Sequence, residues 1–533
     1  MTRVIVAGSG ASGLTAALAA AAAGADVLVL ERTGLLGGTT ALGGGQVWVP
    51  ANHFPENAGD SPAAARAYLD WLLPGQYAHM TEAFVSRAGE MARFVETRSS
   101  HRFAACPRYP DYYPGRPGAT LGGRCLDMLP ADLSAIVPLA RQVRVPPDYL
   151  PMTHAEWERW RFPDRYDWDL LRDRNRNQVA AGGPALVAAL ADGVIRAGAR
   201  IQASTRLIDV TVGDDGAVTG VVAERGGGTG RDAVTVHVPA SAVILATGGF
   251  DWDEGLRRTW HPAARRATGA PPGNTGDALR IAARLGAVTA NLAEGWWMPM
   301  IEIPGEEADG RPCYRALIWE RAVPRQIMVN AAGRRFTDEA APGHEVGRAM
   351  HGRDVRGCPN DPAYLVFDSG FARRYPLPAI TSGVVADWVP RARSLAALAR
   401  LIGVDPGGLE RTAQRWNRAC VDGADPEFGR GGNPSDRYGG DPDAAPSPNL
   451  GPLTEPPFYA VRVLAGTTGT KGGHVTDANG TVLTEKDNPV PGLYAVGDAA
   501  AFWAGGACPA PGAALGFGMT MGYLAGRHAA LTR

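Results

Sequence analysis

The sequence has no excess of positive charge and no clustered cysteines. Of its 533 residues, 53 are Lys or Arg and 54 are Asp or Glu, giving a formal net charge of -1. Without an overall basic field a protein gains little from releasing the counterions of a nucleic acid, so we expect no nucleic-acid partner. The 6 cysteines lie far apart, with no Cys-x-x-Cys pair and no histidine spacing typical of a metal site. We therefore expect no bound metal, and free thiols in a reducing cytoplasm.

The chain also lacks a long uninterrupted apolar run near its start. The alanine-rich segment Leu14–Ala23 is apolar, but Gly24 and Asp26 interrupt it and no cluster of basic residues precedes it. A membrane-spanning helix needs about 20 consecutive apolar residues, and a secretory signal begins with a basic region. We expect no transmembrane segment and a cytoplasmic location. The composition, 45% hydrophobic and 20% charged, is that of a globular protein long enough for two domains.

What the sequence does contain begins with a dinucleotide-binding pattern. The run Arg3–Ala7 leads directly into Gly8–Gly13, which reads Gly-Ser-Gly-Ala-Ser-Gly. In this fingerprint the glycines permit a tight turn and close approach of the backbone to a diphosphate, which the N-terminus of the next helix binds. A second strand, Ala25–Leu30, ends in Glu31, about 20 residues after the last glycine, where an acid binds an adenosine ribose. This order predicts a Rossmann-type site, but it does not separate NAD from FAD.

Five further segments indicate which of the two cofactors, NAD or FAD, is expected: Gly37–Gly45, Ala242–Gly249, Asn274–Asp277, Gly492–Asp498 and the helix start Gly512–Met519. Together they resemble the flavin-contacting segments of the fumarate reductase and succinate dehydrogenase flavoprotein superfamily, which implies FAD as the cofactor. The first of them has no histidine where covalent members carry theirs, so the resemblance implies non-covalent FAD. The residues assigned to the cofactor are Gly8, Gly10, Ser12, Gly13, Glu31, Arg32, Gly38, Thr39, Thr40, Gly43, Gly44, Leu207, Thr247, Gly248, Asp277, Asp498, Ala514 and Leu515.

A narrower resemblance comes from the middle and the end of the chain. The segments Glu320–Pro324, Gly333–Glu339, Phe428–Gly431, Pro456–Ala460 and Gly469–Gly473 resemble the 3-ketosteroid Δ1-dehydrogenase branch. This implies an α/β fold, with a Rossmann-type FAD-binding domain built from both chain ends, residues 1–290 and 456–533. An inserted α+β catalytic domain, residues 291–455, is expected to cap it. Residues 121–179, rich in Trp, Arg and Pro, match the branch least and have no predicted role.

The departures from this branch fall where it carries catalytic tyrosines. Family members have a Tyr at the position of Gly343 and a second, ketone-binding Tyr at the position of Cys508. In the family a glycine N–H also hydrogen-bonds the substrate ketone, and this glycine corresponds to Gly512. A third family Tyr corresponds to Tyr112. Desaturation beside a ketone needs a donor at the carbonyl and a base for the α-proton. Tyr112 is the expected base or proton relay, His344 is the alternative, and Cys508 fits better as a small pocket-lining residue.

Aromatic residues provide candidates for a substrate pocket. We expect Phe502 and Trp503, between the flavin-binding acid and Cys508, to line an apolar substrate site, together with Tyr113 and Gly343. Most of the other tryptophans and tyrosines, among them Trp296, Trp297, Tyr314, Trp319 and Trp388, fit ordinary core packing.

These observations predict an FAD-dependent oxidoreductase acting on the carbon–carbon bond beside a carbonyl of a bulky, apolar, cyclic substrate. A small dicarboxylate is disfavoured as the substrate. Fumarate-binding members share a His in the segment that corresponds to Thr470–Gly473 and an Arg in the segment that corresponds to Gly505–Gly512, and this chain lacks both. Desaturation is the first choice, and ene-reduction of an enone uses the same geometry. A third alternative is a flavin-bearing protein without redox turnover, which binds a ligand or catalyses a non-redox rearrangement. The electron acceptor or donor is not predicted.

Overall fold

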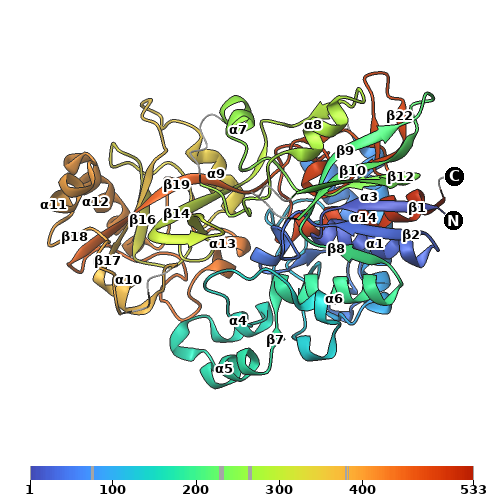
Figure 1. The fold of residues 1–533 in the computed structure, drawn as a ribbon. Helices are drawn as coiled ribbons and strands as arrows, with labels where there is room; N and C mark the ends of the chain where they lie inside the picture. The colour runs from blue at the N-terminus through green and yellow to red at the C-terminus, as the bar shows by residue number, and fades with distance from the viewer. Residues whose placement is uncertain are drawn as a thin grey trace.

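The computed structural model describes residues 2–73, 77–226, 233–261, 267–378, 381 and 383–531. Two six-stranded sheets, each with its own helices, lie at opposite ends of the molecule (Figure 1). The first sheet is near the chain ends, on the right of the view, and the second is built from the middle of the chain. Among the described helices, none combines the length and the apolar character needed to cross a membrane.

The first sheet contains the dinucleotide-binding pattern. Its spatial order is β21-β22-β12-β1-β2-β8, and all neighbours except β21 and β22 pair in parallel. The strands are β1 (Arg3–Ala7), β2 (Asp26–Leu30), β8 (Arg200–Gln202), β12 (Ala242–Leu245), β21 (Thr481–Leu483) and β22 (Pro489–Ala495). Their apolar runs fit a parallel sheet that is covered on both faces.

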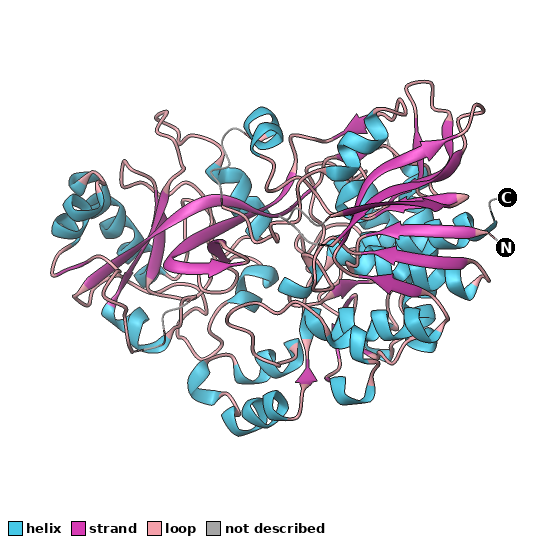
Figure 2. Ribbon diagram, viewed as in Figure 1, coloured by secondary structure: helices cyan, strands magenta, loops and turns pink. Residues whose placement is uncertain are grey.

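One face of this sheet is covered by helices, shown in cyan in Figure 2, of which α1 (Ala11–Ala22), α6 (Gly182–Arg196) and α14 (Ala513–Leu531) belong to one large core. α1 and α14 pack backbone to backbone. A Cβ added at Gly522 would lie 2.4 Å from the Ser12 carbonyl oxygen, and one at Gly526 would lie 2.1 Å from that of Ala16. Only glycine permits this approach, so the chain's first and last helices form one unit.

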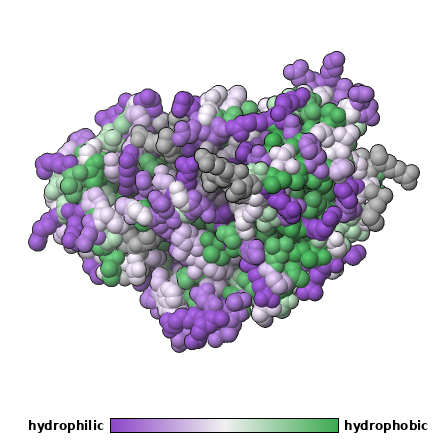
Figure 3. Space-filling view, viewed as in Figure 1, coloured by the Kyte–Doolittle hydropathy of each residue, from purple (hydrophilic) through white to green (hydrophobic). Residues whose placement is uncertain are grey.

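The opposite face is covered by a three-stranded antiparallel sheet of β9 (Thr205–Val212), β10 (Val218–Arg225) and β11 (Val234–Pro239), together with α8 (Asp277–Ala283). The other elements of this half are β3 (Val47–Trp48), α2 (Pro62–Leu72), α3 (Ala78–Arg98), β4 (Phe103–Ala105), β5 (Cys125–Met128), β6 (Ala131–Asp132), α4 (His154–Trp160), α5 (Trp168–Arg176), β7 (Val179–Ala180), α7 (Glu254–Trp260), β13 (Thr289–Ala290) and β20 (Gly473–His474). The segment around α4 and α5 forms the hydrophilic lower edge of the view in Figure 3.

The second sheet is antiparallel, with the order β15-β14-β19-β17-β16 and with β18 paired to β19. Its strands are β14 (Gly295–Ala308), β15 (Arg311–Ala316), β16 (Gln326–Val329), β17 (Ala363–Asp368), β18 (Arg391–Ala392) and β19 (Phe458–Thr470). Its helices are α9 (Gly343–Met350), α10 (Ser369–Arg374), α11 (Leu395–Ile402), α12 (Pro406–Asp422) and α13 (Pro434–Gly439). Two apolar clusters cover its two faces.

The boundary expected at residue 456 needs correction. β19 pairs with β14 through Met300 and Leu464 and with β17 through Val366 and Ala460. The strand Phe458–Thr470 therefore lies in the second sheet, and the chain returns to the cofactor-binding half only after it. The sequence of this strand gave no indication of which of the two sheets it joins.

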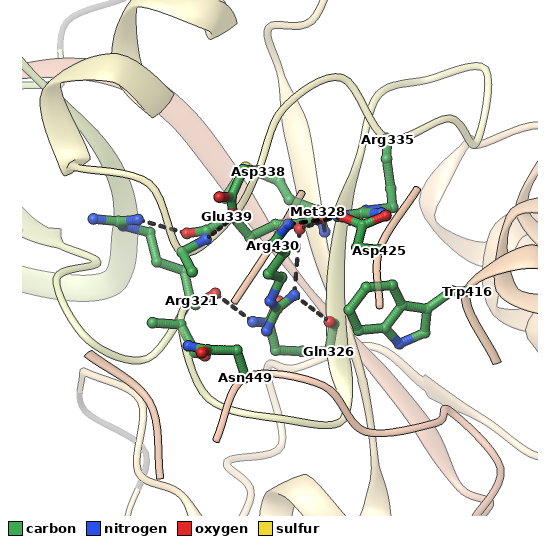
Figure 4. A network of polar contacts seen from close by, with 12 residues as sticks. Arg321, Gln326, Met328, Arg335, Asp338, Glu339, Trp416, Asp425, Arg430 and Asn449 are labelled. Atoms are coloured by element: carbon green, nitrogen blue, oxygen red, sulfur yellow. Dashed lines mark hydrogen bonds and ion pairs between the residues drawn. The ribbon is translucent and has the colours of Figure 1, made fainter. Parts of the chain in front are cut away.

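A buried ion-pair network connects separate segments of the second half of the molecule (Figure 4). Arg335 contacts Glu339 at 2.6 Å and Asp425 at 2.8 Å, while Arg430 contacts Glu339 at 3.3 Å, and all four side chains are buried. Trp416 lies beneath both guanidinium groups, 4.7 Å from that of Arg335 and 5.0 Å from that of Arg430. The Gly333–Glu339 and Phe428–Gly431 motifs thus meet as one structural network.

Candidate active site

A cavity of about 740 Å³ runs past the carboxyl ends of β1, β2 and β12 and continues between the two halves. This is where open parallel sheets bind dinucleotides. The residues that the sequence assigned to the cofactor all lie in its wall: Gly8, Gly10, Ser12, Gly13, Glu31, Arg32, Gly38, Thr39, Thr40, Gly43, Gly44, Leu207, Thr247, Gly248, Asp277, Asp498, Ala514 and Leu515.

The turn between β1 and α1 is built to approach a ligand closely. Gly8 has φ +116°, and a Cβ there would lie 2.1 Å from the Ala246 carbonyl oxygen. A Cβ at Gly13 would lie 2.3 Å from the Gly8 carbonyl oxygen. The N–H groups of the first turn of α1 face the cavity end of the strands, where they bind phosphate oxygens in this motif.

Glu31 is fixed in place at the end of β2. One carboxylate oxygen accepts from Ser9 Oγ at 2.5 Å, and the other accepts from the N–H of Thr33 at 2.8 Å. The side chain is buried and still lines the cavity. A carboxylate held in this way matches the ribose-binding acid of the motif.

The end of the cavity beside β2 carries a shared ion pair. Arg206 contacts both carboxylate oxygens of Asp277, at 2.9 and 2.7 Å. Arg32 contacts the same carboxylate at 3.4 Å and donates to the hydroxyl of Thr275 at 2.6 Å. Both arginines are therefore already engaged with protein oxygens.

The start of α14 provides N–H groups at the other end of the cavity. Ala514 and Leu515 line the wall within the first turn, where helical N–H groups have no intrahelical partner. Asp498 lies nearby and accepts from the indole N–H of Trp296 at 3.2 Å. Burial, together with the charge of Asp251, raises the pKa of Asp498 to about 7.

The donor set fits FAD. The wall contains buried polar atoms without a hydrogen-bond partner among the described residues, Thr247 Oγ1 and Arg144 Nε. With the free N–H groups at two helix starts and the carboxylate of Glu31, they match an anionic diphosphate, a ribityl chain and a ribose. These residues would hold FAD, which supplies a two-electron acceptor when bound.

Tyr112 lies in the same wall, in a loop that is fixed from both sides. Its N–H donates to the Pro509 carbonyl at 3.0 Å, and the preceding Asp111 accepts from Arg124 at 2.8 Å. Within the described part of the chain, the Tyr112 hydroxyl has no hydrogen-bond partner and is thus available to a ligand. Burial raises the pKa of Tyr112 well above its ordinary value.

Cys508 and Gly512 lie across the same cavity. Burial raises the pKa of the Cys508 thiol to about 11, so the thiol is protonated at neutral pH. Gly512 has φ +77°, and a Cβ there would lie 2.7 Å from the Gln46 carbonyl oxygen. Its own N–H donates to no acceptor among the described residues, which leaves it free for a carbonyl of a substrate.

His344 lines the cavity, but both ring nitrogens are in use. The N–H of Trp297 donates to Nδ1 at 3.3 Å, so Nε2 carries the proton and donates to the Gly506 carbonyl at 2.6 Å. Burial and the nearby positive charge of Lys471 lower the pKa of His344 well below its ordinary value. This ring is held neutral, which makes it a poor candidate for the base.

Gly343 and Tyr113 do not line the cavity. A Cβ at Gly343 would lie 2.3 Å from Met298 Sδ and 3.3 Å from Arg321 Nη2, so these two side chains occupy the space of the missing tyrosine. Tyr113 points elsewhere and donates its hydroxyl to Glu345 at 2.7 Å.

The expected role of Phe502 and Trp503 also needs correction. Both are buried in the core beneath the cavity, where Phe502 packs on Phe517 at 5.0 Å and Trp503 packs on the same ring at 5.0 Å. They line a separate, much smaller void of about 40 Å³. The aromatic residues of the main wall are instead Tyr109, Tyr112, Tyr149, Trp157, Trp296, Trp297 and Trp319.

The segment that completes the wall had no predicted role. Residues between Arg144 and Trp157 line the cavity, and Trp157 stacks on Trp319 of the second half with 4.4 Å between ring centroids. The segment lies within the stretch 121–179 that matched the family least. Its high Trp content was the one available signal, but it has no periodicity that would place it.

The family described as "FAD binding domain" matches residues 3–515. The chain belongs to this FAD-binding family. It is 40% identical over 538 residues, 98% of this chain and 92% of the relative, to 4-oxocyclohexanecarboxylate 2-dehydrogenase of Sinomonas cyclohexanicum. It is 34% identical over 563 residues, 99% of this chain and 98% of the relative, to 3-oxosteroid 1-dehydrogenase of Mycobacterium tuberculosis.

Structural comparison agrees. The 3-ketosteroid Δ1-dehydrogenase of Sterolibacterium denitrificans, solved with 1,4-androstadiene-3,17-dione, superposes with a TM-score of 0.92 at 33% identity and 100% coverage of both chains. A flavocytochrome c3 fumarate reductase shares the fold, with a TM-score of 0.63 at 20% identity, covering 99% of this chain and 78% of the other. The predicted family, fold class and FAD cofactor are confirmed, and the chain is an FAD-dependent dehydrogenase of the FAD-binding family.

Proposed function

We propose that this enzyme removes two hydrogen atoms from the carbon–carbon bond beside the ketone of a cyclic, mostly apolar substrate and produces the conjugated enone. One observation carries the proposal. The free N–H of Gly512 and the unpaired phenol of Tyr112 share one cavity wall with the FAD-binding residues. A carbonyl donor and a proton acceptor are the two protein groups that such a desaturation requires.

Gly512 is the proposed carbonyl donor. A hydrogen bond from its N–H to the ketone oxygen withdraws electron density from the carbonyl and makes the α-proton more acidic. The rigid turn at φ +77° holds this N–H in one direction. Cys508 fills the space beside it as a neutral thiol rather than as a second strong donor.

Tyr112 is the proposed acceptor of the α-proton. Burial opposes ionisation of its phenol, while the positive charge of Arg321 acts in the opposite direction and lowers the Tyr112 pKa. The Arg321 guanidinium is buried and donates to the Leu317 carbonyl at 3.0 Å and to the Glu339 carbonyl at 2.5 Å. Because these partners are neutral, its charge stays available to stabilise a tyrosinate. FAD bound in the cavity would accept the β-hydrogen as a hydride.

The cavity wall favours a ring-shaped substrate. Trp157, Trp296, Trp297 and Trp319 add apolar aromatic surface to the cavity that Tyr112 and Gly512 also line. The relatives named above act on a 4-oxocyclohexanecarboxylate and on 3-oxosteroids, one ring and four fused rings respectively. A cyclic ketone is common to both.

Anaerobic titration of the purified FAD-loaded enzyme tests the proposal. We expect a saturated cyclic ketone to bleach the oxidised flavin and to lose two hydrogen atoms by mass spectrometry. 4-Oxocyclohexanecarboxylate and 5α-androstane-3,17-dione, both saturated beside the ketone, are the first two ketones to compare, and cyclohexanecarboxylate, which has no ketone, is the matched control. Bleaching by none of the ketones contradicts the proposal, and exclusive re-oxidation of the reduced flavin by enones would assign the reverse reaction instead.

A further inference from the structure

Arg144 has an unusual environment for a charged side chain. It is 7% exposed and lines the cofactor cavity. Its Nη1 contacts the carboxylate of Asp309, while its Nε has no hydrogen-bond partner among the described residues. Burying a charged donor without an acceptor is costly. The unpaired N–H therefore points to a ligand that the cavity holds.

The backbone places Arg144 next to the diphosphate-binding turn. Leu36 donates its N–H to the Gln142 carbonyl at 2.7 Å, and Arg144 donates its N–H to the Leu36 carbonyl at 3.0 Å. The next residue, Gly37, donates its N–H to Ser9 Oγ at 2.9 Å, inside the Gly8–Gly13 turn. Only the backbone of Leu36 and Gly37 thus lies between the segment carrying Arg144 and that turn.

The charge balance of the wall also singles out Arg144. Among the described residues the wall contains three arginines, Arg32, Arg144 and Arg206. Arg32 and Arg206 share the carboxylate of Asp277. The first turn of α1 has no acidic residue, and the partial positive charge at its N-terminus is about half of one unit. A diphosphate carries about two negative charges, so a further cation in the wall would stabilise it.

We propose that Arg144 binds the diphosphate of FAD through its Nε–H and that Asp309 positions the guanidinium for this contact. Asp309 lies at the turn between β14 and β15, in the second half of the molecule. Asp148 and Arg315 form a second ion pair between the same two segments. FAD affinity consequently depends on residues on both sides of the cavity.

The test measures binding to apoprotein without substrate, so its outcome is independent of the proposed reaction. We expect Arg144→Gln to raise the Kd for FAD about tenfold to hundredfold, the range of one hydrogen bond to a charged group. Arg144→Lys should fall between wild type and Arg144→Gln, since lysine keeps the charge but not the fork of donors. Arg172→Gln, an exposed arginine of α5 paired with Asp169, is the control and should leave the Kd unchanged.

Two shorter probes locate the contact. ADP carries the diphosphate and adenosine does not, so Arg144→Gln should weaken competition by ADP and leave competition by adenosine unchanged. Asp309→Asn should raise the Kd for FAD by a smaller factor, and because Asp309 is exposed we expect this variant to fold normally. An unchanged Kd for FAD in both Arg144→Gln and Asp309→Asn overturns the proposal. An unchanged Kd together with a raised KM for 4-oxocyclohexanecarboxylate overturns it too, because the anion would then be the substrate's carboxylate.

Discussion

The main-chain N–H of Tyr112 donates to the carbonyl of Pro509 at 3.0 Å, although the two residues are far apart in the chain. The same carbonyl accepts from the hydroxyl of Tyr68 at 2.6 Å. The loop that carries the proposed base is therefore joined to the loop that carries Cys508 and Gly512. The two groups proposed to act on the ketone and its α-proton are therefore held by loops that are hydrogen-bonded to each other.

Tyr112→Phe removes the hydroxyl that faces the cavity without removing the ring. We expect kcat to fall about a hundredfold or more, the usual contribution of a general base, while the Kd for FAD stays unchanged. Rapid-mixing measurement of flavin reduction checks this directly. Tyr113→Phe is the matched control, since its hydroxyl bonds Glu345 away from the cavity, and equal losses in the two variants would exclude a specific role for Tyr112.

Gly512→Ala places a methyl group 2.7 Å from the Gln46 carbonyl oxygen, at φ +77°. The turn must shift, so we expect KM for the ketone to rise and the rate of flavin reduction to fall. Gly24→Ala controls for backbone strain alone, because Gly24 also has a positive φ, +91°, but has open space around it. A Gly512→Ala enzyme with wild-type kinetics would rule out Gly512 as the carbonyl donor.

Arg124→Met tests how the Tyr112 loop is held. Arg124 is fully buried and contacts Asp60 at 2.6 Å and Asp111 at 2.8 Å. Removing it leaves two carboxylates buried without their counter-ion, which typically costs about 3–5 kcal/mol. A thermal or denaturant unfolding curve of the variant checks this loss. Arg172→Met breaks an exposed ion pair and should change stability by less than about 1 kcal/mol.

The stability of the apoprotein should depend on Asp498. Burial raises the pKa of Asp498 from its ordinary value near 3.8 to about 7 in the folded state, so the folded protein holds this proton more tightly than the unfolded chain does. The stabilisation from the bound proton is complete below about pH 4 and is lost as the pH rises through 7. Asp498→Asn cannot lose a proton, so its Tm relative to wild type should increase from pH 5 to pH 8. A constant difference across this range would contradict the burial argument.

How much could be read from the sequence differs from one part of the site to another. The Gly8–Gly13 turn and Glu31 were predictable because their chemistry is local: a strand, a turn and a helix start together create the phosphate site. Phe502 and Trp503 were misplaced because an apolar ring has the same sequence signature in a core as in a cavity wall. Only the three-dimensional packing on Phe517 distinguishes the two.

Long-range pairing explains the other gaps. β19 is buried along nearly its whole length, a pattern that fits either sheet, and its assignment depends on β14 and β17, which lie far away in the sequence. Arg144 lies in a segment without helical or strand periodicity, so its position depends on the backbone contacts with Leu36. The absence of a tyrosine at position 343 was visible in the sequence, but the filling of its space by Met298 was not.

The glycine contacts between α1 and α14 have a consequence for biosynthesis. α1 is made long before α14, so a growing chain exposes the apolar surface of α1 until α14 has been made. The flavin site cannot close before then, so we expect cofactor loading to follow the synthesis of α14. Chaperones that shield early helices are accordingly expected to increase the yield of flavin-containing enzyme more than added riboflavin does.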